Sequence, residues 1–331
     1  MQLALIGAGR IGQVHAQAIT AHPGVKLAAI ADFRHEAAEA LALTYSSQAM
    51  STEAIFADET IDAVLIASST PTHAEYFEQA AQSGKAVLCE KPIALDLART
   101  REALDVLSSN PVTCALGFNR RHDPQFSALK QAVAEGRIGV LETLSIISRD
   151  PLPPPAEYVA ASGGLFRDMM IHDFDMARWL LDEPITFVQA TASCLIDPAI
   201  GEAGDVDTAM VTLTTASGRL CHINNSRRAC YGYDQRIEAF GSGGMLQAQN
   251  ETETRLRFTG EGGQVEEKPQ WFFLERYAAA FAREIDDFVT AWQQQRAPLT
   301  SAHDGLEALR LAEAAERSLK EGRRIALDDI R

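Results

Sequence analysis

Three glycines near the start of the chain are spaced as a phosphate-binding loop requires. Gly7, Gly9 and Gly12 follow a short apolar run and precede a stretch with helical periodicity. Glycine at these positions permits a tight strand-to-helix turn, backbone approach to a pyrophosphate and close packing of helix on strand. The first helical residues, Arg10 and Ile11, would then offer free N–H groups to the phosphates. The spacing predicts a dinucleotide site.

An acid follows this loop at the distance that a ribose contact needs. Asp32 lies 20 residues past Gly12, directly after the second apolar run. A carboxylate there accepts hydrogen bonds from both ribose hydroxyls and repels a 2′-phosphate, so NAD is preferred over NADP. Arg34 could pair with a 2′-phosphate, which keeps NADP open as the alternative. We interpret Arg34 as a solvated side chain that at most stacks on the adenine.

A lysine stands where another apolar run ends, in the segment Cys89-Glu90-Lys91-Pro92. Ligands of open α/β sheets bind outside the carboxyl ends of the strands, so we expect Lys91 at the nicotinamide end of the nucleotide. Taken alone, Glu90-Lys91-Pro92 would be an ordinary surface turn. Its interpretation depends on a second set of polar residues farther along the chain.

That second set occupies one face of a helix predicted over 165–181. Asp168, His172 and Asp175 recur at i, i+4 and i+7. A carboxylate one turn from an imidazole fixes its tautomer and raises its basicity, as a general base for an alcohol proton requires. A solitary histidine would be interpreted as a core residue. Because Asp168 is expected one helical turn away and Lys91 at the carboxyl end of a strand, we favour a catalytic role for His172.

Alternating apolar and helical segments must position these residues. Continuous apolar runs, each followed by a helix, predict a doubly wound parallel sheet buried on both faces. Beyond it, alternating segments joined by Ser-Gly and Gly-Gly turns predict a mostly antiparallel sheet, and helical patterns over 273–294 and 302–320 end the chain. We therefore predict an α/β protein with an N-terminal Rossmann domain over 1–118. A C-terminal α/β domain over 119–331 would carry a large, mostly antiparallel open sheet.

Composition limits the partners of this chain. Its 331 residues are 46% apolar and 23% charged, as in soluble globular proteins. A net charge of −15 argues against nucleic acid and anionic membranes. No apolar run approaches the roughly 20 residues of a membrane span, and the N-terminus lacks the features of a signal peptide. The five cysteines show neither C-x-x-C pairs nor metal-ligand spacing, so we expect reduced thiols, a cytoplasmic location and no metal.

Together these motifs resemble the Gfo/Idh/MocA family of oxidoreductases over essentially the whole chain. The resemblance implies NAD(P)-dependent oxidation or reduction at a ring carbon of a sugar or cyclitol, and homodimers or homotetramers formed through the open sheet. The matching segments are GAGRIG with His15, Asp32, Ser69-Thr70-Pro71-Thr72-His73, Glu90-Lys91-Pro92, Gly117-Phe118-Asn119-Arg120-Arg121, and Gly163-Gly164-x-Phe166-x-Asp168-x3-His172-Asp173.

The resemblance also implies a role for individual residues. Lys91, Asp168 and His172 match the catalytic set of the family. The implied cofactor-binding residues are Gly7, Gly9, Arg10, Ile11, Gly12, Asp32, Arg34, Ser69, Thr70, His73, Glu90, Lys91 and Arg121. The implied substrate-binding residues are Lys91, Arg121, Asp150, Asp168, His172 and Tyr233.

Within the family, the segment 166–178 and the motif Tyr231-Gly232-Tyr233-Asp234 look most like inositol 2-dehydrogenases. One segment departs from that group, since Ser148-Arg149-Asp150-Pro151 stands where His-Arg-Asn-Pro is often found. Two expected substrate contacts are therefore altered, and the particular cyclitol or sugar stays open. The favoured reaction is hydride transfer from myo-inositol to NAD⁺, giving 2-keto-inositol in inositol catabolism. His172 would take the hydroxyl proton, Asp168 would orient it and Lys91 would stabilise the alkoxide.

Three alternatives remain at this point. The substrate could be an aldose or another sugar derivative. A non-catalytic regulator that senses NAD or a sugar should have lost Lys91 or His172, and both are present. An enzyme that retains its cofactor through successive oxidation and reduction usually carries an export signal or an N-terminal arm, and we expect neither here.

Overall fold

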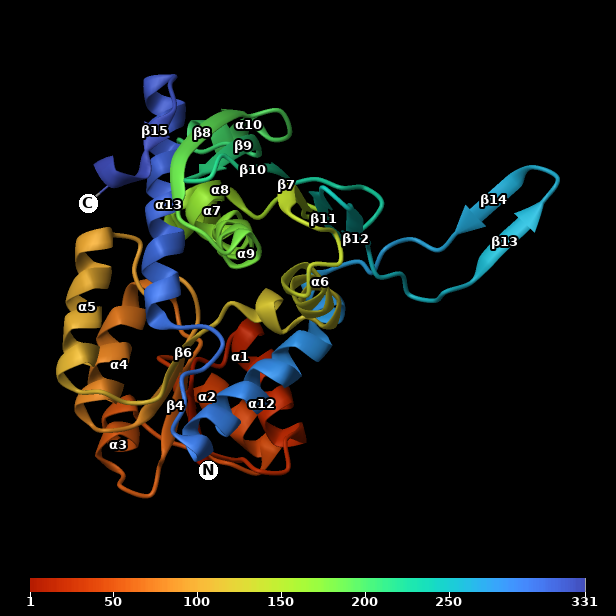
Figure 1. Cartoon of the computed structure of the whole chain (residues 1–331). Coiled ribbons are helices and arrows are strands. Elements are labelled where there is room, and N and C mark those ends of the chain that lie inside the picture. Colours follow the sequence, from red (N-terminus) through yellow and green to blue (C-terminus); the bar gives the residue numbers. More distant parts are fainter. Residues whose placement is uncertain (331) are drawn as a thin grey trace. The chain divides into compact units, whose positions relative to one another are not determined.

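The computed structural model describes residues 1–330, apart from the side chains of Ala156 and Ala160, and the chain forms two compact units. The first unit combines Met1–Asp123 with Ala278–Leu309, and the second combines Pro124–Tyr277 with the segment from Arg310 onward. This differs from the predicted division at 118/119 because helix α12 (Ala278–Gln294) returns to the first unit, where Ile285, Phe288 and Val289 join its core. Figure 1 shows α12 beside helix α1 (Arg10–Ala21).

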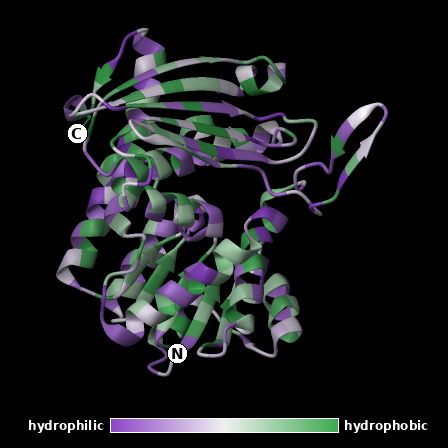
Figure 2. Ribbon diagram, turned by 45° about the vertical axis from the view of Figure 1, so that its right-hand side comes forward, coloured by the Kyte–Doolittle hydropathy of each residue, from purple (hydrophilic) through white to green (hydrophobic). Residues whose placement is uncertain are grey.

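The first unit is built around a six-stranded parallel sheet in the order β3-β2-β1-β4-β5-β6. Its central strands are fully buried because helices cover both faces, and Figure 2 shows their hydrophobic colouring. The doubly wound sheet is thereby confirmed. Its strands are β1 (Gln2–Ile6), β2 (Lys26–Ala31), β3 (Gln48–Ala49), β4 (Ala63–Ile66), β5 (Ala86–Cys89) and β6 (Cys114–Leu116). The remaining helices that begin here are α2 (His35–Tyr45), α3 (Thr52–Ala57), α4 (Thr70–Gln82), α5 (Leu97–Ser109), the 3₁₀ helix η1 (Asn119–His122) and α13 (Ala302–Glu321), which continues into the second unit.

The second unit holds a seven-stranded sheet in the order β12-β11-β7-β10-β9-β8-β15. Every neighbouring pair is antiparallel except β7 with β10, so the mostly antiparallel sheet is confirmed. The strands are β7 (Leu141–Arg149), β8 (Ile185–Ser193), β9 (Thr208–Thr215), β10 (Leu220–Ser226), β11 (Asp234–Gly241), β12 (Gly244–Ala248) and β15 (Ile325–Ala326). The helices are α6 (Pro124–Ala134), α7 (Ala156–Ser162), α8 (Gly164–Asp168), α9 (Ile171–Leu181), α10 (Pro198–Glu202), α11 (Phe273–Arg276) and the 3₁₀ helix η2 (Leu327–Asp329).

The helix expected over 165–181 is divided in two. Helix α8 ends at Asp168 and α9 begins at Ile171. At the break the Met170 N–H donates to the carbonyl of Leu165, five residues back, at 2.9 Å. The buried positions keep their spacing through this widened turn, so apolar periodicity alone does not reveal it. Asp168 and His172 therefore lie on consecutive helices rather than on one.

The strand expected over 253–259 is part of a hairpin. Strands β13 (Arg257–Gly260) and β14 (Gly263–Glu266) pair only with each other within the described chain. Figure 1 shows this hairpin extending away from the sheet of its unit. Its side chains are exposed throughout, Phe258 and Val265 included.

Candidate active site

The glycine loop after β1 has the geometry that a pyrophosphate needs. Gly7 adopts φ +111°, and a Cβ there would lie 2.3 Å from the Ala67 carbonyl oxygen. A Cβ at Gly12 would lie 2.0 Å from the Gly7 carbonyl oxygen. A Cβ at Gly9 would meet nothing within 4 Å, so the chain itself does not require that glycine. Its absent side chain leaves open space at the N-terminus of α1, which fits a phosphate group.

Asp32 holds its carboxylate beside this loop at the end of β2. Its Oδ2 accepts from the Ala8 N–H at 2.8 Å, and its Oδ1 accepts from the Arg34 N–H at 2.9 Å. The Arg34 guanidinium is 60% exposed, lies 3.8 Å from Asp32 through Nε and stands over the Phe33 ring. A fixed negative charge at the loop favours ribose hydroxyls over a 2′-phosphate. The selection of NAD over NADP stays a prediction.

The end of β5 presents Lys91 next to a buried acid. Glu90 Oε1 lies 2.7 Å from His15 Nε2, and its Oε2 accepts from the Lys91 N–H at 3.3 Å. Gly117 leaves the room for this, since a Cβ there would lie 2.8 Å from Glu90 Oε2. Burial acts to raise the pKa of Glu90, but the hydrogen bond with His15 and the charge of Lys91 hold it below its usual value. Glu90 is therefore a carboxylate beside the Lys91 ammonium.

The loop after β4 is fastened to the Lys91–Pro92 turn by His73. Its Nδ1 lies 2.8 Å from the Pro92 carbonyl and its Nε2 lies 3.0 Å from the Ser68 carbonyl. Burial lowers the pKa of His73 although both carbonyls oppose that shift. Ser69 and Thr70 begin α4 at the same loop. His73 thus positions two loops, and its predicted contact with the cofactor, like those of Ser69 and Thr70, remains untested.

Arg121 is buried in η1 and binds the start of α13. Its Nη2 lies 2.9 Å from Asp304 Oδ1, and its Nη1 donates to the Leu299 carbonyl at 3.1 Å. Burial acts to raise the pKa of Asp304, but Arg121 and the Ser301 N–H and hydroxyl bring it down to about 2. This ion pair fixes η1 within the first unit. A contact of Arg121 with cofactor or substrate stays a prediction.

In the second unit, Asp168 lies between two donors that the sequence analysis did not select. The Tyr158 hydroxyl donates to Asp168 Oδ1 at 3.0 Å, and Arg227 Nη2 lies 3.6 Å from Asp168 Oδ2. Burial and the charge of Asp168 raise the pKa of Tyr158, which keeps the phenol a neutral donor. Tyr158 follows the proline run and Arg227 sits in an Arg-Arg pair, so neither carries a distinctive local signal.

His172 belongs to the first turn of α9, and its neighbour Asp173 anchors that helix to the sheet. Asp173 accepts from the Ser148 hydroxyl at 2.6 Å and from the Asn225 amide at 2.9 Å. All three residues are buried. The orientation of His172 therefore depends on β7 and β10. Ser148, the first residue of the segment that departs from inositol 2-dehydrogenases, is an internal partner of Asp173.

Tyr233 is buried and packs edge-on against Tyr277, with ring centroids 5.9 Å apart. Asp150 follows β7, and its N–H donates to the Ser226 carbonyl at 3.0 Å. A neighbouring cluster joins Arg149, which donates to the Tyr231 hydroxyl, to Asp234, which accepts from that hydroxyl at 2.6 Å. The substrate contacts expected of Asp150 and Tyr233 remain predictions.

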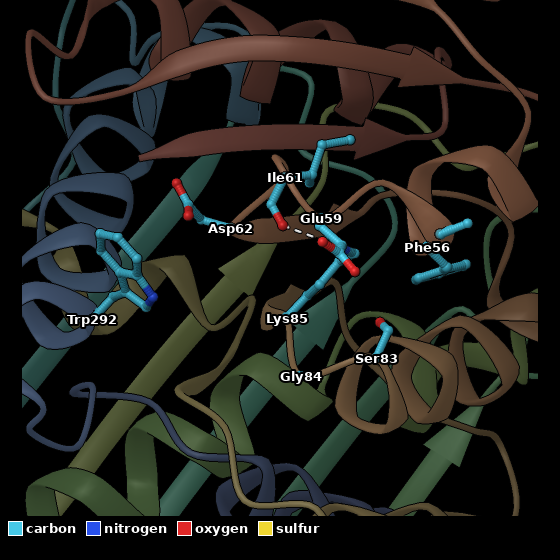
Figure 3. A pocket seen from close by; sticks show the side chains of 9 residues that line it. Phe56, Glu59, Ile61, Asp62, Ser83, Gly84, Lys85 and Trp292 are labelled. Atoms are coloured by element: carbon cyan, nitrogen blue, oxygen red, sulfur yellow. Dashed lines mark hydrogen bonds between the residues drawn. The ribbon is translucent and has the colours of Figure 1, made fainter.

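A polar pocket of about 360 Å³ lies at the opposite edge of the parallel sheet. Figure 3 shows the side chains that line it, including Asp62, Lys85 and Trp292. Lys85 Nζ donates to the carbonyls of Asp58 and Ile61, at 2.7 and 3.0 Å. Because ligands of such sheets bind at the carboxyl ends of strands, this pocket is not part of the nucleotide site.

The described part of the chain, residues 1–330, brings together no three His, Cys, Asp or Glu side chains that could hold a metal ion. It also contains no helix with the length and apolar content needed to cross a membrane.

Comparison with known proteins covers both units. A family model described as an oxidoreductase family with an NAD-binding Rossmann fold matches residues 1–118, and a GFO/IDH/MocA C-terminal domain model matches residues 126–247. The chain is 48% identical to an inositol 2-dehydrogenase of Rhizobium meliloti over 99% of both chains. It resembles a crystal structure of a myo-inositol dehydrogenase from Corynebacterium glutamicum (TM-score 0.95, 43% identity, 99% and 98% coverage). It also resembles a scyllo-inositol dehydrogenase from Lactobacillus casei with bound NAD(H) and scyllo-inositol (TM-score 0.90, 27% identity, 99% coverage of both).

Proposed function

The chain belongs to the Gfo/Idh/MocA oxidoreductase family, and we propose that it is an inositol 2-dehydrogenase that oxidises myo-inositol to 2-keto-inositol with NAD⁺. The observation that carries this proposal is the full catalytic set, Lys91, Asp168 and His172, in a chain 48% identical to an inositol 2-dehydrogenase. A regulator that had lost catalysis would have no use for all three.

Residues at the carboxyl edge of the parallel sheet would hold the cofactor. When bound, NAD⁺ supplies the hydride acceptor. The N–H groups at the start of α1 would bind its pyrophosphate, and Asp32 would accept from the ribose hydroxyls. The open space at Gly9 and the fixed carboxylate of Asp32 support this assignment.

Lys91 and His172 would have different roles in the oxidation of the substrate. The Lys91 ammonium would donate to the reacting hydroxyl oxygen and stabilise its developing negative charge. An imidazole nitrogen of His172 would accept the hydroxyl proton as the ring carbon gives up its hydride. Asp168 would orient His172, while Tyr158 and Arg227 hold the carboxylate of Asp168 in place.

The net charge of the chain favours an uncharged polyol over an anionic substrate. A net charge of −15 does not hinder the approach of a neutral substrate, whereas it would repel an anionic one. An aldose remains the alternative substrate because Asp150 departs from the asparagine often found in inositol 2-dehydrogenases.

We expect this enzyme to work in the cytoplasm as a homodimer or homotetramer formed through the open sheet. Four large apolar side chains on its strands are about half exposed and would be covered by a second copy: Met210, Leu220, Phe240 and Met245. The molar mass in solution, measured by light scattering, tests this part of the proposal.

The function is tested by assaying myo-, scyllo- and chiro-inositol, glucose and galactose with NAD⁺ and NADP⁺ side by side. The proposal predicts the highest kcat/KM for myo-inositol with NAD⁺. A preference for an aldose would select the alternative substrate. NAD⁺ binding without turnover of any polyol would instead favour a regulator.

A further inference from the structure

Glu284 is a buried acid of the first unit that the proposed function does not use. Its side chain is 1% exposed, and neither carboxyl oxygen has a hydrogen-bond partner among the described residues. It lies on α12, one helical turn after Phe281, whose ring stands edge-on to His15 with centroids 5.3 Å apart. Because residues one turn apart share a helix face, Glu284 belongs to the face of α12 that Phe281 turns toward α1. Figure 1 shows these two helices side by side.

The groups around Glu284 offer it little positive charge. Glu90, at the end of β5, and Asp287, on α12 itself, both act on it as negative charges. His122 lies on η1, which packs against α12; burial and Arg121 lower its pKa to about 4, although Asp287 opposes that shift, so its ring is neutral. The Arg121 guanidinium is bound to Asp304.

An ionised carboxylate without hydrogen bonds is strongly disfavoured in such surroundings. Burial, followed by the charges of Glu90 and Asp287, raises the pKa of Glu284 well above its usual value. Glu90 is the ionised member of this acid pair because it is bonded to His15 and lies next to Lys91. Glu284 consequently keeps a proton, and its O–H group is a donor that needs a hydrogen-bond acceptor.

His15 has a ring nitrogen that can accept a hydrogen bond from such a donor. Its Nε2 contacts Glu90 at 2.7 Å, whereas its Nδ1 is buried without a hydrogen-bond partner among the described residues. When Nε2–H donates to Glu90, Nδ1 of the neutral ring is an acceptor. These two buried groups make no direct hydrogen bond in the structure, but a donor and an acceptor of the same cluster can satisfy one another through one buried water.

We propose that Glu284 is a positioning residue whose carboxylic acid donates toward His15 Nδ1, so that the chain Glu284–His15–Glu90 fixes the backbone that carries Lys91. The last link is the bond from the Lys91 N–H to Glu90 Oε2. This inference rests on the proposed function only in taking Lys91 as the catalytic lysine. The protonation of Glu284 stands on its own and can be measured separately.

If Glu284 is protonated in the folded chain, the stability of the fold must depend on pH in a defined direction. The unfolded chain loses this proton near pH 4.5, whereas the folded chain keeps it to higher pH. Wild-type stability should therefore fall, relative to a variant that cannot ionise, as pH rises above that value. Glu284→Gln keeps an N–H donor of similar shape, so its Tm minus the wild-type Tm should increase between about pH 5 and about pH 9. Glu261→Gln, the same exchange at an exposed glutamate between β13 and β14, should show no such rise.

Turnover tests the positioning role. Glu284→Ala removes the donor and should lower kcat by about 10- to 100-fold, the scale expected when a catalytic group is displaced by about 1 Å. Glu284→Gln should restore most of that loss. Because Lys91 acts on chemistry, the KM for NAD⁺ should change little in either variant.

The two experiments together decide the proposal. A Tm difference for Glu284→Gln that stays flat or falls with pH would show that Glu284 is ionised and would overturn it. Equal losses of kcat in Glu284→Gln and Glu284→Ala would overturn the positioning role. If the alanine variant fails to fold, the glutamine variant decides alone, and a kcat as low as that of Lys91→Ala would overturn the positioning role. If the wild type oxidises no inositol, the proposed function fails while the Tm series still decides the state of Glu284.

Discussion

The guanidinium of Arg227, which is 1% exposed, lies 3.6 Å from the carboxylate of Asp168. The charge of a proposed catalytic residue is thus balanced from within its own unit by a buried cation on the segment after β10. The Tyr158 hydroxyl completes the surroundings of that carboxylate. Arg227 and Tyr158 thus hold the two oxygens of the Asp168 carboxylate from two sides.

Removing Arg227 should cost both stability and turnover. In Arg227→Met the Asp168 charge loses its counterion, and breaking a buried pair in this way costs about 3–5 kcal/mol. Urea unfolding should show that loss, and Asp168→Asn combined with Arg227→Met should recover part of it. Arg228→Met, at the exposed neighbour, is the matched control and should leave the free energy of unfolding almost unaltered. Equal stability of the two single variants would contradict the pairing.

Tyr158→Phe should affect catalysis more than folding. It deletes one hydrogen bond to Asp168 from a side chain that is half exposed. Because Tyr158 is half exposed, its hydrogen bond contributes little to folding and Tm should change little. A small displacement of the Asp168 carboxylate should nevertheless lower kcat by roughly 10-fold or more. Steady-state kinetics with saturating cofactor measures this. Unaltered kcat would mean that Arg227 alone is sufficient to hold Asp168.

Asp32 should decide the choice of cofactor. Asp32→Ala removes the charge that repels a 2′-phosphate and leaves Arg34 free to pair with one, so the ratio of kcat/KM for NADP⁺ to that for NAD⁺ should rise by at least about 10-fold. Asp32→Asn, which keeps an acceptor toward the Ala8 N–H, controls for loss of the loop contact. A wild type that already prefers NADP⁺ would make Arg34 the deciding residue.

Lys91→Ala should act on turnover rather than on cofactor binding. Loss of an electrostatic stabiliser of the alkoxide should reduce kcat by about 10³-fold. The affinity for NADH, followed by its fluorescence, should stay within a few fold of the wild type. Near-normal kcat would reduce the Glu90-Lys91-Pro92 segment to a structural turn.

The stability that the Arg121–Asp304 pair contributes should be lost at acid pH. The pKa of Asp304 is about 2, below its usual 3.8, so the pair stabilises the fold fully above that usual value and is lost as pH falls toward 2. Asp304→Asn should therefore be less stable than the wild type by about 2 kcal/mol at neutral pH. That gap, from urea unfolding at several pH values, should close between about pH 4 and about pH 2. A gap that does not depend on pH would assign the loss to packing.

Local patterns predicted most of what lies on the parallel sheet. The glycine loop, Asp32 and the end of β5 each follow a buried strand at fixed spacing, so their places follow from the strand order. The family models confirm the resemblance that these motifs suggested.

The residues that escaped prediction act through long-range contacts. Arg227 meets Asp168 only once β10 lies beside the segment before α9, and Glu284 reaches the first unit only because α12 returns to it. The break between α8 and α9 is hidden because buried side chains keep helical spacing across it. Apolar periodicity predicts that a face is buried, but not which surface covers it.

The central claim is direct hydride transfer from an inositol ring carbon, and isotope transfer tests it most directly. Purified protein would be given NAD⁺ and myo-inositol carrying deuterium at carbon 2, and the NADH formed would be analysed by mass spectrometry. The account predicts NADH that carries the deuterium, formed about 10³-fold more slowly by Lys91→Ala. NADH without deuterium, or no NADH from any inositol under conditions where the protein binds NAD⁺, would contradict it.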